Sequence, residues 1–494
     1  MAEKKYIKID PSDNVVVAVS AIPAGEVLDL PEGPLTVKED IRPGHKIAIR
    51  DIAEGELIIK YHCPIGTASQ PIAAGAWVHT HNTESRLGEL LEYTYTPEVH
   101  PLAPQKPATF RGFVRKDGKV GVRNEIWIIP TVGCVNAIVK EIERRSQEFV
   151  TGSLDGIFCY NHPYGCSQLG HDQIMSMKAL SGLIRHPNAA GVLVLGLGCE
   201  NNNINELKKI LGPYDEERVR FLVSQECEDE IAEGVAIVKE LAEKAAGAER
   251  TECTADKLII GLKCGGSDGF SGITANPLLG RFCDRLIAQG GSAMLTEVPE
   301  MFGAETLLMN RCVDEATFQK TVHLINDFKE YFLSHGEKVG ENPSPGNKEG
   351  GITTLEDKSL GCVQKGGTAP VVDVLSYGDP IQEKGLSLLQ GPGNDLVAST
   401  ALAISGAQIV LFTTGRGTPF GCPIPTAKVS SNSRLAQFKK NWIDFDAGRL
   451  LSEDADEVDA AFYQYVLDIA SGRKVHAESL SKTDLAIFKD GVTL

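Results

Sequence analysis

The chain has 494 residues, of which 42% are hydrophobic and 23% are charged, and its formal net charge is −17. This length exceeds what one hydrophobic core can organise, so about two to four domains are expected. The negative charge argues against nucleic acid or an anionic membrane as the main partner, and no apolar run is long enough to span a bilayer.

The first residues are not followed by an apolar core of the signal-peptide kind, so we expect a cytoplasmic protein. In a reducing compartment its twelve cysteines are expected to be free thiols. Cys159, Cys283 and Cys312 lie in apolar or helical segments and are predicted to fill the core. Other cysteines follow predicted strands, and these carry the functional argument.

Residues 1–84 are predicted to form a small all-β module, because short strand-like runs alternate there with Gly/Pro turns. The module ends in a His-Thr-His-Asn sequence. In extended backbone His79 and His81 project to the same side. Imidazoles so placed can bind a metal or shuttle protons, and His81 is the stronger candidate. The alternative is a pair of surface histidines before a linker.

Residues 85–110 are rich in proline and lack periodicity, which predicts a linker. It is long enough for the β module to pack on a distant part of its own chain or on a neighbouring subunit. Strands and helices alternate over residues 111–250 and again over residues 251–494, the pattern of parallel sheets. The predicted fold class is therefore α/β, with a small N-terminal β module followed by two parallel-sheet α/β domains.

Three predicted strands of the first α/β domain each lead into a Gly-Cys pair, which supplies Cys134, Cys166 and Cys199. Ligands of open parallel sheets bind beyond the carboxyl ends of the strands. Thiols that only filled the core would be expected on strand faces or helices at least as often as at this edge. The pattern predicts a group of soft metal ligands, with His162 nearby as an acid–base candidate.

The segment Cys264–Gly280 follows an apolar strand-like run at residues 258–262 and precedes a predicted helix. Glycines allow its backbone N–H groups to approach an anion, and Ser267 lies among them. Cys264 and Asp268 add one soft and one hard metal-binding group to the same loop. The alternative is a glycine-rich turn with a buried thiol and an N-capping Asp.

A second polar loop follows the apolar run at residues 409–412 and presents Arg416 among glycines and threonines. A guanidinium so placed suits bidentate capture of a carboxylate, whereas the alternative is a structural Arg. Lys428 and Asn432 follow on a predicted strand and turn, where they can hydrogen-bond polyol hydroxyls. No nucleotide-binding fingerprint is present.

Several long motifs, read together, resemble the altronate/galactarate dehydratase family: PTVGCVN, HPYGCSQLG, VLGLGCENN, CGGSDGFSGITANP, LTEVPEMFGAE, NPSPGNKEGGITTLEDKSLG, GPGNDLVA and FTTGRGTPFG. The likeness runs essentially from end to end, and the β module with its HTHN ending resembles a SAF (β-clip) domain. One departure is the His62 that follows Tyr61, where a glycine is expected.

The resemblance implies an iron-dependent hydro-lyase that converts an aldonate to a 2-keto-3-deoxy acid. HPYGCSQLG and PEMFGAE favour the branch that dehydrates D-altronate to 2-dehydro-3-deoxy-D-gluconate, in hexuronate catabolism. Dehydration of galactarate or another sugar acid, expulsion of sulfite instead of water, and non-catalytic binding of a sugar acid are the alternatives. A homodimer is expected.

Our hypothesis for the site combines these loops around iron. The expected metal ligands are Cys134, Cys166, Cys199, Cys264 and His81. They would hold either an iron–sulfur cluster or a single Fe²⁺ with a mixed Cys/His/oxygen set. The expected acid–base groups are His81, His162 and Asp268. The expected substrate-binding residues are Asn82, Ser267, Arg416, Thr418, Lys428 and Asn432.

Overall fold

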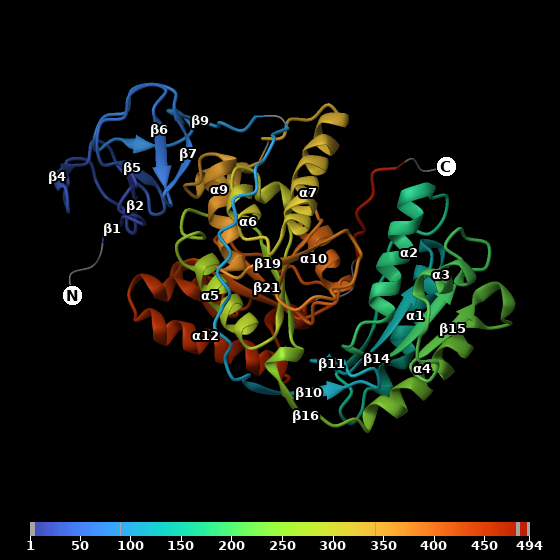
Figure 1. Ribbon diagram of the computed structural model, residues 1–494. Coiled ribbons are helices and arrows are strands. Elements are labelled where there is room, and N and C mark those ends of the chain that lie inside the picture. The colour runs from blue at the N-terminus through green and yellow to red at the C-terminus, as the bar shows by residue number, and fades with distance from the viewer. Residues whose placement is uncertain (1–4, 89, 341, 481–484, 492–494) are drawn as a thin grey trace.

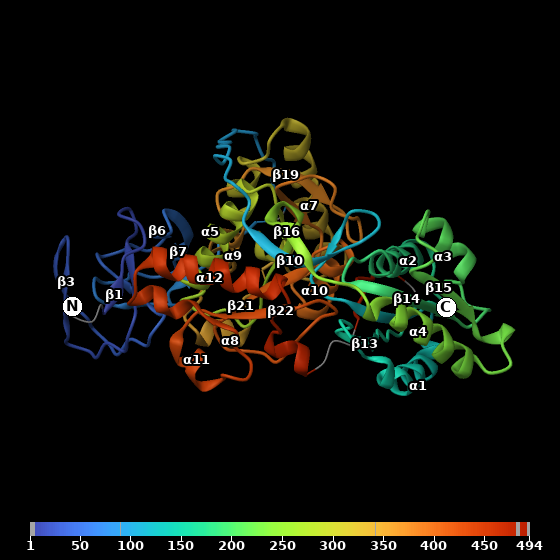
Figure 2. The same cartoon turned by 90° about the horizontal axis from the view of Figure 1, so that it is seen from below.

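The computed structural model of the chain describes residues 5–88, 90–340, 342–480 and 485–491. The β module lies at one end of the molecule, the C-terminal domain in the middle and the other α/β domain at the far end (Figures 1 and 2). The fold is α/β, with a small antiparallel β module followed by parallel sheets covered by helices. The predicted fold class is confirmed.

The β module consists of short antiparallel strands. These are β1 (Tyr6–Ile7), β2 (Val15–Ala18), β3 (Val27–Leu30), β4 (Gly33–Thr36), β5 (Lys46–Ala48), β6 (Leu57–Lys60), β7 (Cys63–Ala68), β8 (Trp77–Val78) and β9 (Thr83–Glu84). They form a β1-β2-β5-β8 sheet, a β3-β4 hairpin and a β6-β7-β9 sheet. Glycines and prolines between the strands make the turns that prevent helices from forming.

The linker after β9 is held on the surface of the C-terminal domain of its own chain (Figure 1). Tyr93 donates a hydrogen bond to Glu305 at 2.6 Å, and Tyr95 donates one to the carbonyl of Cys312 at 2.6 Å. The N–H of Gln105 donates to a backbone carbonyl at 2.7 Å. These contacts fix the path of the segment, so the module packs against its own chain.

The second domain is built on a parallel sheet of order β13-β12-β14-β15. Its strands are β12 (Glu125–Pro130), β13 (Gly156–Cys159), β14 (Ala189–Gly196) and β15 (Val219–Val223), and its helices are α1 (Asn136–Ser146), α2 (Gly170–Ile184), α3 (Ile204–Leu211) and α4 (Glu230–Ala246). Because the sheet is covered on both faces, its strands are almost continuously apolar. A small antiparallel sheet of β10 (Thr109–Val114), β11 (Val120–Gly121) and β16 (Thr251–Thr254) closes the domain.

The C-terminal domain contains a seven-stranded parallel sheet, of order β19-β20-β18-β17-β21-β22-β23. The strands are β17 (Ile259–Cys264), β18 (Ser292–Leu295), β19 (Val371–Leu375), β20 (Leu386–Leu389), β21 (Ile409–Thr414), β22 (Thr426–Ser430) and β23 (Phe445–Asp446). The helices are α5 (Ala275–Ala288), α6 (Glu305–Met309), α7 (Glu315–Ser334), α8 (Pro345–Glu349), α9 (Leu355–Cys362), α10 (Asp395–Ile404), α11 (Ser433–Phe438) and α12 (Ala455–Ala470).

The two α/β domains share one hydrophobic core. Trp127 and Leu180 of the second domain belong to the same buried cluster as Leu402 and Phe412 of the C-terminal domain. Helices α2 and α10 pack against each other across this boundary, and both run from the carboxyl edge of their sheet toward its amino edge. The carboxyl edges of the two sheets therefore face the same side of the molecule.

The described part of the last segment lies along this side, between the two domains. The N–H of Ile487 donates to the hydroxyl of Tyr164 at 3.2 Å, and the N–H of Gly491 donates to Asp172 at 3.0 Å. The ring of Phe488 packs on Phe328 with centroids 5.9 Å apart. Among the described helices, none is both long and apolar enough to cross a membrane.

Candidate active site and metal centre

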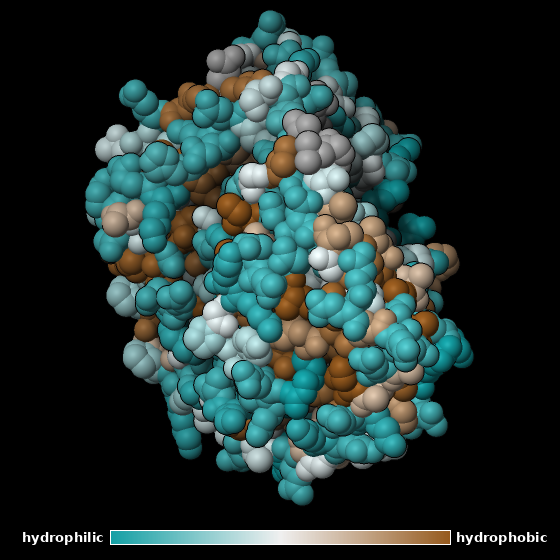
Figure 3. Space-filling model, turned by 90° about the vertical axis from the view of Figure 1, so that its right-hand side faces the viewer, coloured by the Kyte–Doolittle hydropathy of each residue, from teal (hydrophilic) through white to brown (hydrophobic). Residues whose placement is uncertain are grey.

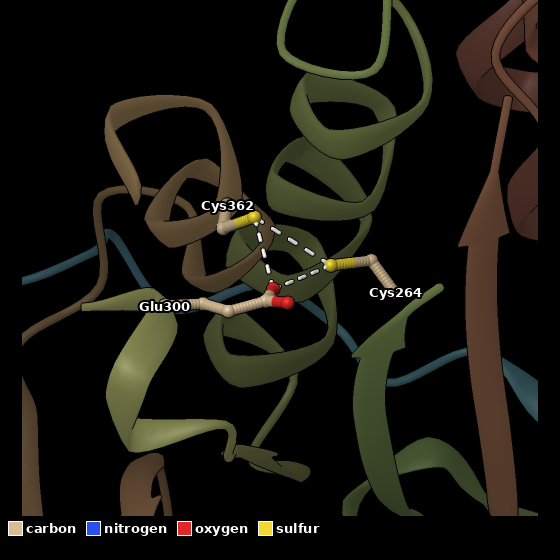
Figure 4. A group of neighbouring side chains, drawn as sticks. All are labelled: Cys264, Glu300 and Cys362. Atoms are coloured by element: carbon tan, nitrogen blue, oxygen red, sulfur yellow. Dashed lines mark hydrogen bonds between the residues drawn. The ribbon is translucent and has the colours of Figure 1, made fainter. Parts of the chain in front are cut away.

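Three side chains of types that can bind a metal converge in the C-terminal domain (Figure 4). Cys264 ends β17, Glu300 ends the short helical turn after β18, and Cys362 ends α9. The Cys264 thiol lies 2.9 Å from Glu300 Oε2 and 3.5 Å from the sulfur of Cys362, which is itself 3.1 Å from Glu300 Oε2. All three are buried, and in the described parts of the chain they alone form a group of three or more such donors within 4.8 Å.

Buried lysines surround this group. Lys358 Nζ lies 2.8 Å from Glu300 Oε1, while Lys263 and Lys365 pair with Glu297. Burial alone would raise the pKa of the Glu300 carboxyl, but the three lysines outweigh it and hold that pKa well below its usual range. Glu300 is therefore an anion ready to bind a cation.

The chemistry of the three donors suits a transition metal. Two sulfurs are soft ligands, and the carboxylate is a hard one. The hydrogen bond with Cys264, together with burial, raises the pKa of the Cys362 thiol. A bound cation would reverse this effect, because a coordinated thiol loses its proton. The group, which we call the Cys–Glu–Cys triad, thus fits the Fe²⁺ that the sequence leads us to expect.

Asp268 lies on the glycine-rich loop after Cys264 and is buried. Its carboxylate accepts hydrogen bonds from Ser431 Oγ at 2.7 Å, Ser271 Oγ at 3.0 Å and Asn432 Nδ2 at 3.1 Å. Burial raises the pKa of Asp268 although these donors oppose the shift. Helix α5 begins six residues beyond Gly269 with Thr274 at its N-cap, so Asp268 does not cap this helix.

A small cavity connects Asp268 with the triad. It is lined by Ser267, Asp268, Lys358 and Cys362, and by Lys60 of the β module, and it has room for about one water molecule. The hydroxyl of Ser267 is buried without a hydrogen-bond partner among the described residues. An unpaired hydroxyl next to a carboxylate and a lysine suits a polar ligand.

The loop after β21 brings Arg416 to the rim of the same loop region, because its N–H donates to the carbonyl of Gly266 at 3.1 Å. The guanidinium is 45% exposed and contacts Glu349 at 3.0 Å. Such a surface ion pair is worth about 0–1 kcal/mol, so Arg416 can exchange it for another carboxylate at little cost.

The other predicted substrate residues on these loops have local partners. Asn432 holds Asp268 and caps α11 through the N–H of Leu435 at 2.9 Å. Thr418 Oγ1 accepts from the N–H of Phe420 at 3.2 Å. Lys428 is buried and donates to the carbonyl of Phe420. Burial lowers the pKa of Lys428 to about 8. These contacts shape the loop from within.

The β module docks beside this region through buried charges. Lys46 and Lys60 lie 2.8 and 3.0 Å from the two carboxylate oxygens of Asp357 on α9. Burial alone would raise the pKa of Asp357, but the two lysines hold it well below its usual range. One carboxylate therefore joins two strands of the module to the helix that carries Cys362.

The histidines of the module lie in a cluster of rings around Trp77. His79 stacks on Trp77 and is buried, whereas His81 is exposed with its ring 5.1 Å from that of Trp77. Asn82 is used inside the module, because it accepts from the N–H of His79 and donates to the carbonyl of Trp77. The neighbouring His45 contacts the carbonyl of Glu349 at 3.2 Å, which brings this ring cluster next to the segment that also meets Arg416.

A second set of thiols lies on three loops at the carboxyl edge of the second domain. Cys134, Cys166 and Cys199 are all exposed. The loops are bound to one another: the N–H of Gly133 donates to the carbonyl of Tyr164, the N–H of Asn202 to that of Gly165, and Thr131 to Glu200. The three thiols thus lie on neighbouring loops that hydrogen-bond to one another.

His162 shapes the middle loop of this set. One ring nitrogen lies 2.7 Å from the carbonyl of Pro130, and the other accepts from the N–H of Tyr164 at 3.2 Å. Burial lowers the pKa of His162 to about 4, so the ring is neutral at pH 7. Both of its nitrogens are engaged by backbone, which leaves neither free for proton transfer in this structure.

The structure divides the expected metal ligands differently from the sequence hypothesis. Cys264 belongs to a buried group with Glu300 and Cys362, whereas Cys134, Cys166 and Cys199 lie on another sheet. Among the described residues, the predicted cysteines and His81 do not form one group close enough for a single ion. The reason is topological, since the two carboxyl edges belong to separate sheets that pack side by side.

Comparison with known proteins identifies the family. Family models match the chain in three consecutive parts: the altronate/galactarate dehydratase SAF domain at residues 4–86, the D-galactarate dehydratase/altronate hydrolase second domain at residues 112–246, and the D-galactarate/altronate dehydratase C-terminal domain at residues 255–493. The chain belongs to the altronate/galactarate dehydratase family.

Similar members of the altronate/galactarate dehydratase family cover almost the whole chain. An altronate dehydratase of Bacillus subtilis (strain 168) is 55% identical, over 99% of this chain and 100% of that protein. An altronate dehydratase of Escherichia coli (strain K12) is 50% identical over the same shares. A galactarate dehydratase (L-threo-forming) of Escherichia coli (strain K12) is 33% identical, over 95% of this chain and 93% of that protein.

In this member of the altronate/galactarate dehydratase family, three site residues escaped the sequence reasoning: Glu300, Lys358 and Cys362. Glu300 lies in the motif LTEVPEMFGAE, where acidic residues follow an apolar run. The sequence therefore shows where Glu300 lies in the chain, but not that it meets Cys264 and Cys362. Cys362 and Lys358 come from a helix, and no strand-end pattern marks them. One clue is present in the sequence: the motif NPSPGNKEGGITTLEDKSLG ends at Gly361, and Cys362 follows it directly.

Proposed function

We propose that this protein is an Fe²⁺-dependent hydro-lyase that dehydrates D-altronate to 2-dehydro-3-deoxy-D-gluconate. The observation that carries the proposal is the buried Cys–Glu–Cys triad, whose Cys362 lines the same cavity as Asp268 and Ser267. The two relatives with half or more of their residues identical are both named altronate dehydratases, which favours altronate over galactarate as the substrate.

The reaction removes a weakly acidic proton from C2 of a sugar acid and expels the C3 hydroxyl as water. The substrate is already an anion, so the negative charge that develops at C2 and the carboxylate needs electrophilic help. An Fe²⁺ ion held by Cys264, Glu300 and Cys362 would supply this help as a Lewis acid.

The chain's own residues would bind the substrate and move the proton. Arg416 would hold the substrate carboxylate in a bidentate contact. Ser267 would accept a hydrogen bond from a substrate hydroxyl, because its own hydroxyl has no partner among the described residues. Asp268 would take the C2 proton on a carboxylate oxygen, since its raised pKa brings it closer to the working pH.

A second place for iron is favoured by the three exposed thiols of the second domain. Cys134, Cys166 and Cys199 lie on loops tied together by hydrogen bonds. Three thiolates can hold an iron–sulfur cluster, in which each binds a different iron and the sulfurs lie further apart than around one ion. Iron and acid-labile sulfide measured on anaerobically purified protein separate the two: absence of sulfide removes the cluster.

The test of the function is a panel of aldonates and aldarates incubated anaerobically with the protein and Fe²⁺ and scored for 2-keto-3-deoxy product. We expect altronate to give product and galactarate to give much less. The variant Cys362→Ser should lose iron and activity together, whereas the matched control Cys283→Ser, at a buried thiol outside the triad, should keep both. Binding of altronate without product would instead favour a sugar-acid-binding protein.

The homodimer and the cytoplasmic location expected from the sequence stay predictions. Size-exclusion chromatography with light scattering tests the first, because a dimer doubles the molar mass of the 53.2 kDa chain.

A further inference from the structure

A large pocket lies between the two α/β domains, at the edge opposite the triad. It has a volume of about 460 Å³, within the range of roughly 300–1,000 Å³ that is usual for small-molecule sites. Its walls come from the loop between β10 and β11, the C-terminal half of α2, the end of α10, and the residues just before β17 and β21. These segments lie near the amino ends of the strands of both sheets. Cys264, in contrast, lies at the carboxyl end of β17.

The lining of the pocket carries an excess of positive charge, although the whole chain is strongly negative. The charged residues that line it are Asp117, Lys119, Lys178, Arg185, Lys257, Asp379 and Lys384, an excess of three positive charges. Lys178 pairs with Asp379 at 2.8 Å, but Lys119 meets a carboxylate only at 3.6 Å and Lys257 only at 3.8 Å. Arg185 and Lys384 donate to backbone carbonyls instead, so among the described residues these two cations have no carboxylate within ion-pair distance.

Two buried hydroxyls line the same pocket without hydrogen-bond partners among the described residues. Ser181 is 2% exposed and Ser405 is fully buried. Buried polar groups are normally paired, and leaving one unpaired costs about 1–3 kcal/mol. A ligand oxygen could satisfy Ser181 after a rotation of its hydroxyl toward the pocket, whereas Ser405 is closed off, and the evidence from Ser181 is independent of the charge.

Much of the remaining wall is apolar. Ile210, Ile259, Ile381 and Ile404 line it. A simple sugar phosphate has no part that would gain from contact with four isoleucines, whereas a molecule with a planar or apolar group would. On the face that the second domain presents in Figure 3, hydrophilic residues predominate, with apolar residues gathered in patches among them.

We propose that this pocket binds a phosphorylated small molecule that carries a planar or apolar part, the chemical class to which mononucleotides belong. The phosphate would lie among the lysines and beside Ser181, and the apolar part against the isoleucines. This proposal does not depend on the dehydratase reaction. Because both domains contribute walls, an occupant would bind the arrangement of the two domains seen here and stabilise it.

The experiment uses the full-length protein and measures affinity by isothermal titration calorimetry and the melting temperature by differential scanning fluorimetry. The probes are AMP, ribose 5-phosphate, adenosine and inorganic phosphate. We expect AMP to bind at one site per chain and raise the melting temperature, with adenosine and ribose 5-phosphate at least tenfold weaker. No binding of any phosphate probe at millimolar concentration, or adenosine binding as tightly as AMP, would overturn the proposal.

Variants locate the site. Lys119→Glu combined with Lys384→Glu changes two exposed cations of the pocket, and we expect at least a tenfold loss of AMP affinity. The matched control combines Lys239→Glu with Lys244→Glu, which reverse the charge of two exposed lysines on α4 outside the pocket. This control should leave the AMP affinity unchanged. Equal affinities in the two double variants would show that AMP binds elsewhere.

The serines give a second check that does not rely on charge. Ser181→Ala should weaken AMP binding severalfold while the free protein melts at the same temperature or higher, because an unpaired hydroxyl is removed. Ser399→Ala is the control, since this α10 serine is also buried and unpaired among the described residues but does not line the pocket. If Ser181→Ala binds AMP as well as Ser399→Ala does, the assignment fails.

Discussion

Replacing Glu300 with glutamine tests the triad most directly, because it separates metal binding from structural charge balance. The change keeps the shape of the side chain but removes the negative charge that pairs with buried Lys358 at 2.8 Å. Breaking a buried ion pair from one side costs about 3–5 kcal/mol. Lys358 keeps two amide oxygens, of Asn342 at 3.0 Å and Asn347 at 3.3 Å, so we expect the lower end, about 3 kcal/mol.

The assay is urea denaturation of metal-free protein under nitrogen, followed by iron titration of the folded variants. Glu300→Gln should lower the free energy of unfolding by about 3 kcal/mol and weaken iron binding at least tenfold. Adding Lys358→Met should restore most of the stability, because the unpaired cation is gone, but should not restore iron binding. Unchanged stability in the single variant, or normal iron affinity in the double variant, would refute the reasoning.

Three further changes probe other parts of the molecule. Arg416→Ala should raise KM for the sugar acid at least tenfold with little effect on stability, because its present ion pair is on the surface; an unchanged KM in steady-state assays removes that role. Asp357→Asn leaves two buried lysines without a charge partner and should destabilise docking of the β module by about 3–5 kcal/mol, seen as faster limited proteolysis of the linker than in wild type. Burial lowers the pKa of His162 to about 4 and that of His186 to about 3. The stability that these neutral rings give is therefore complete above pH 6.5 and is lost as the pH falls below it, by about 1.4 kcal/mol per pH unit for each ring. Urea midpoints measured from pH 7 to 5 should drop accordingly, and less steeply in His186→Gln.

The elements that position the site follow from local sequence. The apolar runs that end near Leu262 and Phe412 become adjacent central strands, β17 and β21, because continuous apolar runs of this length must be buried on both faces. Cys264 and Arg416 follow these strands directly, so chain connectivity alone puts them at one edge. This part of the site was predictable.

The partners of Cys264 were not predictable in the same way. Cys362 arrives from the end of α9, almost a hundred residues away, and its position depends on how that helix packs rather than on any strand register. Likewise the strand-end pattern of Cys134, Cys166 and Cys199 reveals a common edge of one sheet but not how that edge is placed relative to the Cys264 loop of the other. Residue spacing reports local geometry, while a coordination sphere is a property of tertiary packing.

The part that the N-terminal module takes in the wall of the Asp268 cavity has a kinetic consequence. On the proposed assignment, a six-carbon acid needs more room than this cavity offers, so some of its walls, to which the module contributes Lys60 and Tyr61, would have to move when substrate binds. The linker that begins at residue 85 is hydrogen-bonded to the C-terminal domain and keeps the module attached to it. Return of the module to its docked position therefore would not depend on protein concentration. On this assignment, opening and reclosing of these walls would set an upper limit on the rate of substrate turnover.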